Sequence, residues 1–154
     1  MRNFLSQEDI EEMKKEIEYR KVVERKRLIE DVKEARAHGD LSENFEYKAA
    51  KRERGKNESR IRYLEKMIKT GHIISTESSV DEVGLNKDVK IKFLDDDFEQ
   101  VFNIVTTMKT DAVNNKISIE SPLGKAIFKK KVGDIILVEA PEGSYEVEII
   151  EIFS

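Results

Sequence analysis

The chain has 154 residues, enough for one domain or two small ones with a modest core. It contains no cysteine, which excludes a disulfide framework and a thiolate zinc site. No stretch approaches the roughly 18 apolar residues that a membrane helix needs, and residues 1–9 show no signal-peptide pattern. We therefore expect a cytoplasmic protein that makes no contact with a membrane.

Charge divides the chain into two unlike halves. Residues 1–75 hold 19 Lys and Arg against 16 Asp and Glu, whereas residues 76–154 hold 9 against 16. This asymmetry indicates two units with different partners, so we expect a boundary between residues 75 and 76. The overall charge of −4 disfavours free binding to duplex DNA, because such binding depends on neutralising phosphates. Any contact with nucleic acid should be local.

The first half predicts two long helices. Residues 7–36 contain neither Pro nor Gly and are mostly good helix formers, and Ser6 can act as the N-cap. Gly39 interrupts this helix, and a second Pro-free stretch covers residues 41–69 before Gly71. Long helices joined by a turn of a few residues pack antiparallel, so we expect a coiled-coil hairpin.

The seam of this hairpin is apolar at its ends and polar in its middle. Apolar residues recur at intervals of three and four, as a coiled coil requires. The middle offers Arg54 and Asn57 on the second helix, and no apolar residue at Arg20 or Glu24 on the first. The arms should therefore bury little surface. The expected seam residues are Ile10, Met13, Ile17, Leu28, Val32 and Ala35, facing Tyr47, Ala50, Arg54, Asn57, Ile61, Leu64 and Ile68.

The second half alternates apolar and charged residues, the pattern of strands with one buried face. Ser121 and Pro122 before residues 123–128 predict an N-cap, a proline at the first helical position and one short helix. The fold class should be α+β, with a helical hairpin followed by a small antiparallel β domain. Its strands are expected around residues 89–93, 102–104, 117–119, 135–138 and 145–149.

Two carboxylates, Asp40 and Glu43, stand where the hairpin turns. One interpretation is structural, because an N-cap followed by Glu three residues later has the spacing of a capping box. The other is chemical, since paired carboxylates suit a hard cation such as Mg²⁺, which takes one or two carboxylates and leaves other positions to waters and phosphates. Spacing alone leaves both interpretations open.

The sequence around this turn resembles a known family. Residues 34–47 read EARAHGDLSENFEY, and the likeness continues through residues 49–51, 83–86, 116–126 and 131–134. In this order the segments resemble the GreA/GreB family of bacterial transcript-cleavage factors, and GreA more than GreB, over practically the whole chain. Phe45 and residues 106–109 depart from the family pattern.

The resemblance implies an FKBP-like second domain and RNA polymerase as the partner. It implies a monomeric accessory factor, not an enzyme, whose hairpin enters the polymerase secondary channel and stimulates the polymerase's own cleavage of backtracked RNA. Asp40 and Glu43 would hold a Mg²⁺ shared with the polymerase and position its water. By the same resemblance, the residues expected to contact the nascent RNA are Arg36, Lys48, Lys51 and Arg52, and those expected to dock on the polymerase are Ser121 and Pro122.

Other interpretations stay open. The basic residues can equally form a solvated helix face with local ion pairs, and Ser121 and Pro122 can simply start a helix. A factor that occupies the channel without promoting cleavage is the main functional alternative, and Asp40 with Glu43 argues against it. A prolyl isomerase is a weaker one, because fold does not imply function and the second half has no Trp and only Tyr145 of the four tyrosines.

Overall fold

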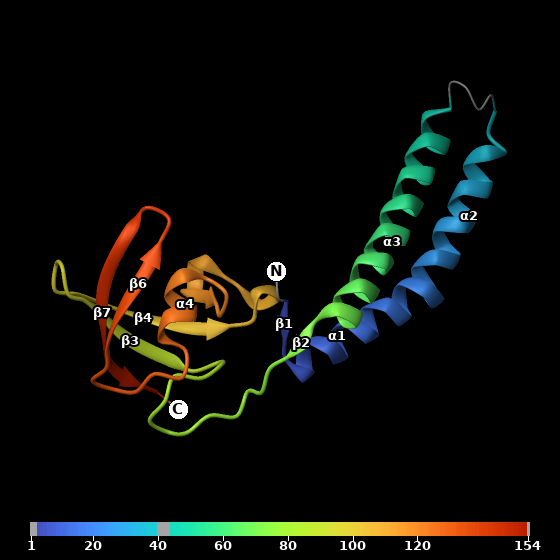
Figure 1. Ribbon diagram of the computed structural model, residues 1–154. Coiled ribbons are helices and arrows are strands. Elements are labelled where there is room, and N and C mark those ends of the chain that lie inside the picture. The colour runs from blue at the N-terminus through green and yellow to red at the C-terminus, as the bar shows by residue number, and fades with distance from the viewer. Residues whose placement is uncertain (1–2, 40–43, 154) are drawn as a thin grey trace. The chain divides into compact units, whose positions relative to one another are not determined.

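The computed structural model describes residues 3–39 and 44–153 (Figure 1). The chain forms two compact units. One holds Glu8–Gly71, and the other combines His72–Ser154 with the N-terminal Met1–Gln7. The expected division into a hairpin domain of residues 1–75 and a β domain of residues 76–154 stays a prediction. Within the described residues, no helix is both long enough and apolar enough to cross a bilayer.

The first unit is a two-armed helical hairpin, which confirms the predicted architecture (Figure 1). The first arm consists of α1 (Gln7–Tyr19), a π-helical turn (Arg20–Glu24) and α2 (Arg25–Arg36). The second arm is α3 (Phe45–Thr70). The π-helical turn was not predicted, and it falls in the polar middle of the seam.

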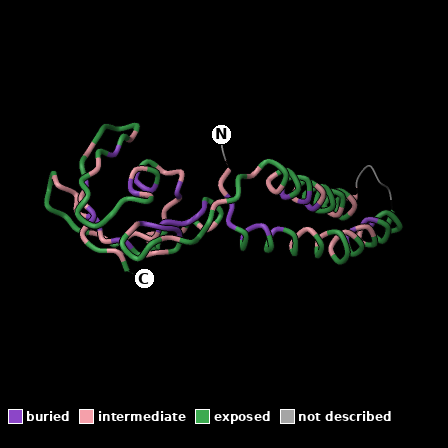
Figure 2. Tube along the Cα trace, turned by 60° about the horizontal axis from the view of Figure 1, so that its bottom comes forward, coloured by how far each residue is buried: buried purple, intermediate pink, exposed green. Residues whose placement is uncertain are grey.

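Burial in the hairpin is confined to one stripe on each arm, as Figure 2 shows. This follows from the spacing of the apolar residues, since only one face of each helix meets the other arm. No residue of the π-helical turn is buried. The arms therefore bury little surface at their middle, as the sequence predicted. The buried seam residues are Ile10, Met13, Leu28, Val32 and Ala35 on the first arm and Asn57, Ile61 and Leu64 on the second.

The second unit is built on a five-stranded sheet with the order β5-β4-β3-β7-β6. The strands are β3 (Asp88–Phe93), β4 (Phe98–Val105), β5 (Lys116–Ser118), β6 (Ile135–Ala140) and β7 (Gly143–Ile152). All neighbours are antiparallel except β4 and β5, which run parallel. The sheet is therefore mixed, whereas the sequence predicted an antiparallel one, but the α+β class is confirmed.

One core lies between the sheet and α4 (Pro122–Ile127). The alternation read from the sequence places Val89 and Ile91 of β3 and Val147 and Ile149 of β7 on the inner face, and all four are fully buried. Ile127 of α4 packs into the same cluster. The helix thus covers the apolar face that the strands present.

A short pair of parallel strands, β1 (Phe4–Leu5) and β2 (His72–Ile73), also belongs to the second unit. Phe4 lies opposite His72 and Leu5 opposite Ile73. Phe4 and Ile74 pack against the core of the second unit. The segments that precede and follow the hairpin are therefore built into the β unit.

Candidate functional site

The acidic residues of the predicted tip, Asp40 and Glu43, lie outside the described residues. The geometry that can be given is that of the helix ends on either side of them, α2 up to Arg36 and α3 from Phe45.

Asn44 joins these two helix ends. Its Oδ1 accepts a hydrogen bond from the backbone N–H of Tyr47 at 3.0 Å, which makes it the N-cap of α3. Its Nδ2 donates to the carbonyl of Ala35 in the last turn of α2 at 2.6 Å. One amide thus caps one arm and ties it to the other.

This geometry corrects the predicted start of the second helix. We expected the helix to begin at Leu41 with Asp40 as its N-cap, but it begins at Phe45 and its cap is Asn44. The capping-box spacing drew attention to Asp40, although Asn is an equally favoured N-cap residue and was present in the sequence.

Two further pairs link the helix ends. Arg36 donates from Nη2 to the hydroxyl of Tyr47 at 3.3 Å, and its guanidinium lies 5.5 Å from the centroid of the Tyr47 ring. The hydrogen bond from Arg36 lowers the pKa of the Tyr47 phenol, and the positive charge of Lys51 adds to the effect. Nδ1 of His38 lies 3.2 Å from a carboxylate oxygen of Glu46. Arg36, one of the predicted RNA contacts, is therefore engaged within the hairpin.

The other three predicted RNA contacts form an exposed basic face on α3. Lys51 and Arg52 follow Lys48 by three and four residues, which places both beside Lys48 on the helix surface. Lys48 lies with Nζ 5.7 Å from the ring centroid of Phe45, a side chain that is 79% exposed. The structure brings these side chains together on one exposed surface of α3.

In the second unit, Ser121 and Pro122 start α4 as predicted. Oγ of Ser121 accepts from the N–H of Gly124 at 3.1 Å and donates to the carbonyl of Ser118 at 2.6 Å. Pro122 occupies the first turn, where its missing N–H costs nothing. This position of α4 favours glycine, because a Cβ on residue 124 would collide with the carbonyl oxygen of Ser118.

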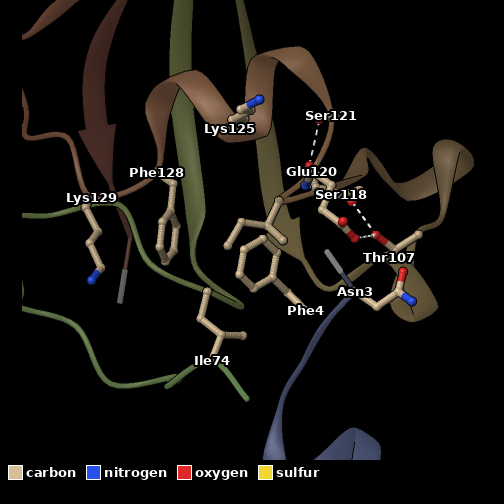
Figure 3. Close-up of a pocket in the computed structure, with 11 residues that line it drawn as sticks. Asn3, Phe4, Ile74, Thr107, Ser118, Glu120, Ser121, Lys125, Phe128 and Lys129 are labelled. Carbon is tan, nitrogen blue, oxygen red and sulfur yellow. Dashed lines mark hydrogen bonds between the residues drawn. The ribbon is translucent and has the colours of Figure 1, made fainter. Parts of the chain in front are cut away.

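A pocket of about 980 Å³ opens beside this helix start (Figure 3). Its apolar lining comes from Phe4, Ile74, Ile119 and Phe128, and its polar lining from Asn3, Thr107, Ser118, Glu120, Ser121, Lys125 and Lys129. The hydroxyl of Thr107 lies 2.7 Å from that of Ser118 and donates to the Glu120 carboxylate at 2.5 Å. These bonds fix one polar edge of the pocket.

The sequence did not predict this pocket. Its walls come from segments far apart in the chain, including Phe4 and Ile74, which we had assigned to the hairpin. The available signal was the pair of short apolar runs flanking the two helices, because an antiparallel hairpin brings its two ends together.

Comparison with known proteins identifies the family. Residues 3–73 match the N-terminal model of the GreA/GreB transcription elongation factors, and residues 69–154 match the C-terminal one. The chain belongs to the GreA/GreB family of transcription elongation factors.

Two relatives named GreA agree with this membership. Transcription elongation factor GreA of Thermoanaerobacter pseudethanolicus is 43% identical over 149 residues, which cover 96% of this chain and 95% of that protein. GreA of Streptococcus pneumoniae serotype 2 is 42% identical over 146 residues, covering 94% and 91%. Among solved structures, Thermus aquaticus Gfh1 matches with 26% identity, 99% coverage of each chain and a TM-score of 0.45.

Family membership confirms the predicted function at this level. The chain is a GreA-type elongation factor, a cleavage-stimulating accessory protein of RNA polymerase and not itself an enzyme.

Proposed function

We propose that the hairpin enters the secondary channel of RNA polymerase and that Asp40 and Glu43 act there on the cleavage of backtracked RNA. The family match over both units supports the polymerase as partner. The proposal for these two acids rests on the identity of the N-cap of α3, which is Asn44. Because Asn44 already satisfies the first turn of that helix, the second arm does not need Asp40 as its N-cap.

The donor chemistry of this pair fits Mg²⁺. Carboxylate oxygens are hard ligands, and two of them leave most of an octahedral shell to be filled by waters, RNA phosphates or polymerase side chains. When bound, such a cation activates water and stabilises charge on the leaving oxygen. In our proposal Asp40 helps to hold the cation and Glu43 orients the attacking water, while the polymerase remains the catalyst.

The basic face of α3 is proposed to hold the RNA. Lys48, Lys51 and Arg52 are exposed and adjacent, so their charges can act together on phosphates. Arg36 is proposed as a weaker contact, because its guanidinium is already shared with Tyr47.

The second unit is proposed to dock on the polymerase through Ser121, Pro122 and the adjacent pocket. An apolar floor with a few fixed polar groups at its edge is the usual design of a recognition pocket. Pro122 is exposed at the start of α4, next to that opening. We further propose a cytoplasmic monomer, in keeping with a chain that contains no cysteine.

The test uses a stalled, backtracked elongation complex with Mg²⁺. We expect the wild-type factor to release short 3′ RNA fragments, and Asp40→Ala or Glu43→Ala to abolish release with little change in polymerase binding. Glu30→Ala is the matched control, because Glu30 is an exposed acid of α2 that pairs with Lys33 at 3.8 Å, away from the tip. Wild-type factor that binds without releasing RNA would show a channel-occupying regulator instead.

A further inference from the structure

In the middle of the hairpin seam, the buried side chain of Asn57 is paired with the partly exposed Arg20. Asn57 of α3 is only 3% exposed. Arg20 donates from Nη1 to Oδ1 of Asn57 at 2.9 Å, and Nδ2 of Asn57 donates back to the backbone carbonyl of Arg20 at 3.2 Å. Glu16 extends the pair by accepting from Arg20 at 2.7 Å and from Arg60 at 2.9 Å. A buried amide matched to the facing helix is a device that fixes register in coiled coils.

The carbonyl of Arg20 has a second role. It also accepts the N–H of Arg25, five residues later, which closes the π-helical turn. Asn57 therefore contacts the same carbonyl oxygen that defines the irregular turn.

The spacing of seam residues shows what this turn accomplishes. From Arg20 to Leu28 the seam advances eight residues, where a heptad pattern would advance seven. A π-helical turn accommodates one extra residue. Without it, Leu28, Val32 and Ala35 would be rotated by about 100° about the helix axis, one α-helical residue, and would no longer face α3.

We infer that Asn57 is a positioning residue that holds the extra residue of the first arm at Arg20–Glu24 and thereby sets the register of α2 against α3. The seam beyond the turn cannot do this alone. Met13, Ile61 and Leu64 anchor the base of the hairpin and are at most 2% exposed, whereas the far half relies mainly on Leu28 and the smaller Val32 and Ala35.

Two substitutions separate the two hydrogen bonds of Asn57. Asn57→Leu removes both and supplies an apolar side chain of similar size. Asn57→Asp keeps an acceptor for the Arg20 guanidinium, but its carboxylate cannot donate to the Arg20 carbonyl. Lys56→Leu is the control, since it places the same leucine on the exposed neighbouring position.

The structural readouts are amide exchange at Arg25 and distances between nitroxide labels. The chain has no cysteine, so labels can be placed by introducing cysteine pairs into the full protein. One pair, at Lys33 and Glu53, spans α2 and α3 beyond the turn. The other, at Lys15 and Lys66, spans the arms at the base.

We expect both Asn57 variants to speed exchange of the Arg25 amide by roughly tenfold. We also expect the Lys33–Glu53 distance to shift by several ångström or to split into two populations, while the Lys15–Lys66 distance and the control stay unchanged. Unaltered distances at both pairs would overturn the inference. A change in the Lys15–Lys66 distance would also overturn the inference, whether or not the Lys33–Glu53 distance changes, because a local positioning role leaves the base of the hairpin unaltered.

The consequence for cleavage rests on the proposed function. If α2 and α3 hold Asp40 and Glu43 in place, the Asn57 variants should release RNA at least several-fold more slowly at saturating factor, with binding little changed. Shifted distances with normal cleavage would overturn this link alone. Wild-type factor that releases no RNA would overturn the proposed function and leave the register result standing.

Discussion

Arg36 and Tyr47 show how single side chains stabilise the end of a hairpin that has little core. The guanidinium both donates to the phenol and lies over its ring, so one cation serves two interactions between the arms. The phenol of Tyr145, in the second unit, has the opposite surroundings. Burial raises its pKa, and the nearby Glu142 carboxylate adds to the rise.

We predict that these two tyrosines titrate in opposite directions from the usual value of about 10. Tyr47 should ionise before Tyr145, because Arg36 stabilises the Tyr47 phenolate whereas burial disfavours that of Tyr145. Since the folded pKa of Tyr47 is the lower one, its contribution to stability is present above the unfolded pKa and is lost as pH falls through the folded pKa. NMR titration of labelled tyrosine rings checks the order.

The control for this titration is Arg36→Gln, which should return Tyr47 toward the usual value and leave Tyr145 unchanged. If Tyr47 ionised together with Tyr145 or after it, the contact between Arg36 and Tyr47 would not exist in solution.

At the scale of elements, a helix or strand could be predicted where its own stretch of sequence carries a clear pattern. The helices followed from long Pro-free stretches, and β3 and β7 followed from alternation around Ile91 and Ile149. The π-helical turn was missed because its two apolar residues, Val22 and Val23, are exposed and off the seam, so no seam residue marks the position of the extra residue. The parallel pairing of β4 with β5 was missed because alternation gives burial and says nothing about partners.

The candidate site divides in the same way. Ser121 as an N-cap was predictable because capping is local chemistry. The link that Asn44 makes between the arms was not predictable, since its second hydrogen bond reaches Ala35 on the other arm. The pocket depends on Phe4 and Ile74 packing against the β unit, and the short apolar runs that contain them show burial without showing which unit they pack against. The roles of Asp40 and Glu43 stay predictions.

Two glycines in helices give a paired prediction at this scale. Gly124→Ala should destabilise the second unit by about 1–3 kcal/mol, because its new methyl group collides with the carbonyl of Ser118. Gly55→Ala should stabilise the hairpin by about 0.5–1 kcal/mol, because nothing lies within 4 Å and alanine is the better helix former. Hydrogen exchange, which reports on each unit separately, measures both. Equal signs for the two substitutions would contradict this account.

At the scale of the whole molecule, the β unit begins with the first strand of the chain. β1 precedes the hairpin in sequence, yet it pairs with β2, which follows the hairpin. The helical excursion of residues 8–71 is thus inserted into the second unit, which is completed only when both flanking segments are in place. The net charges of the two halves could not reveal this insertion, because the flanking segments are too short to change either net charge appreciably.

This arrangement predicts that a change at the N-terminus weakens the C-terminal unit. Phe4→Ala should destabilise that unit by roughly 1–3 kcal/mol, less than the usual cost of truncating a core Phe, because Phe4 is only partly buried. Exchange of the Ile91 and Ile149 amides should accelerate, while that of Ile61 and Leu64 in the hairpin stays the same. Val113→Ala is the control, since that side chain is 91% exposed. Acceleration confined to the hairpin would instead place residues 3–7 with the helices, as the original division at residue 75 implied.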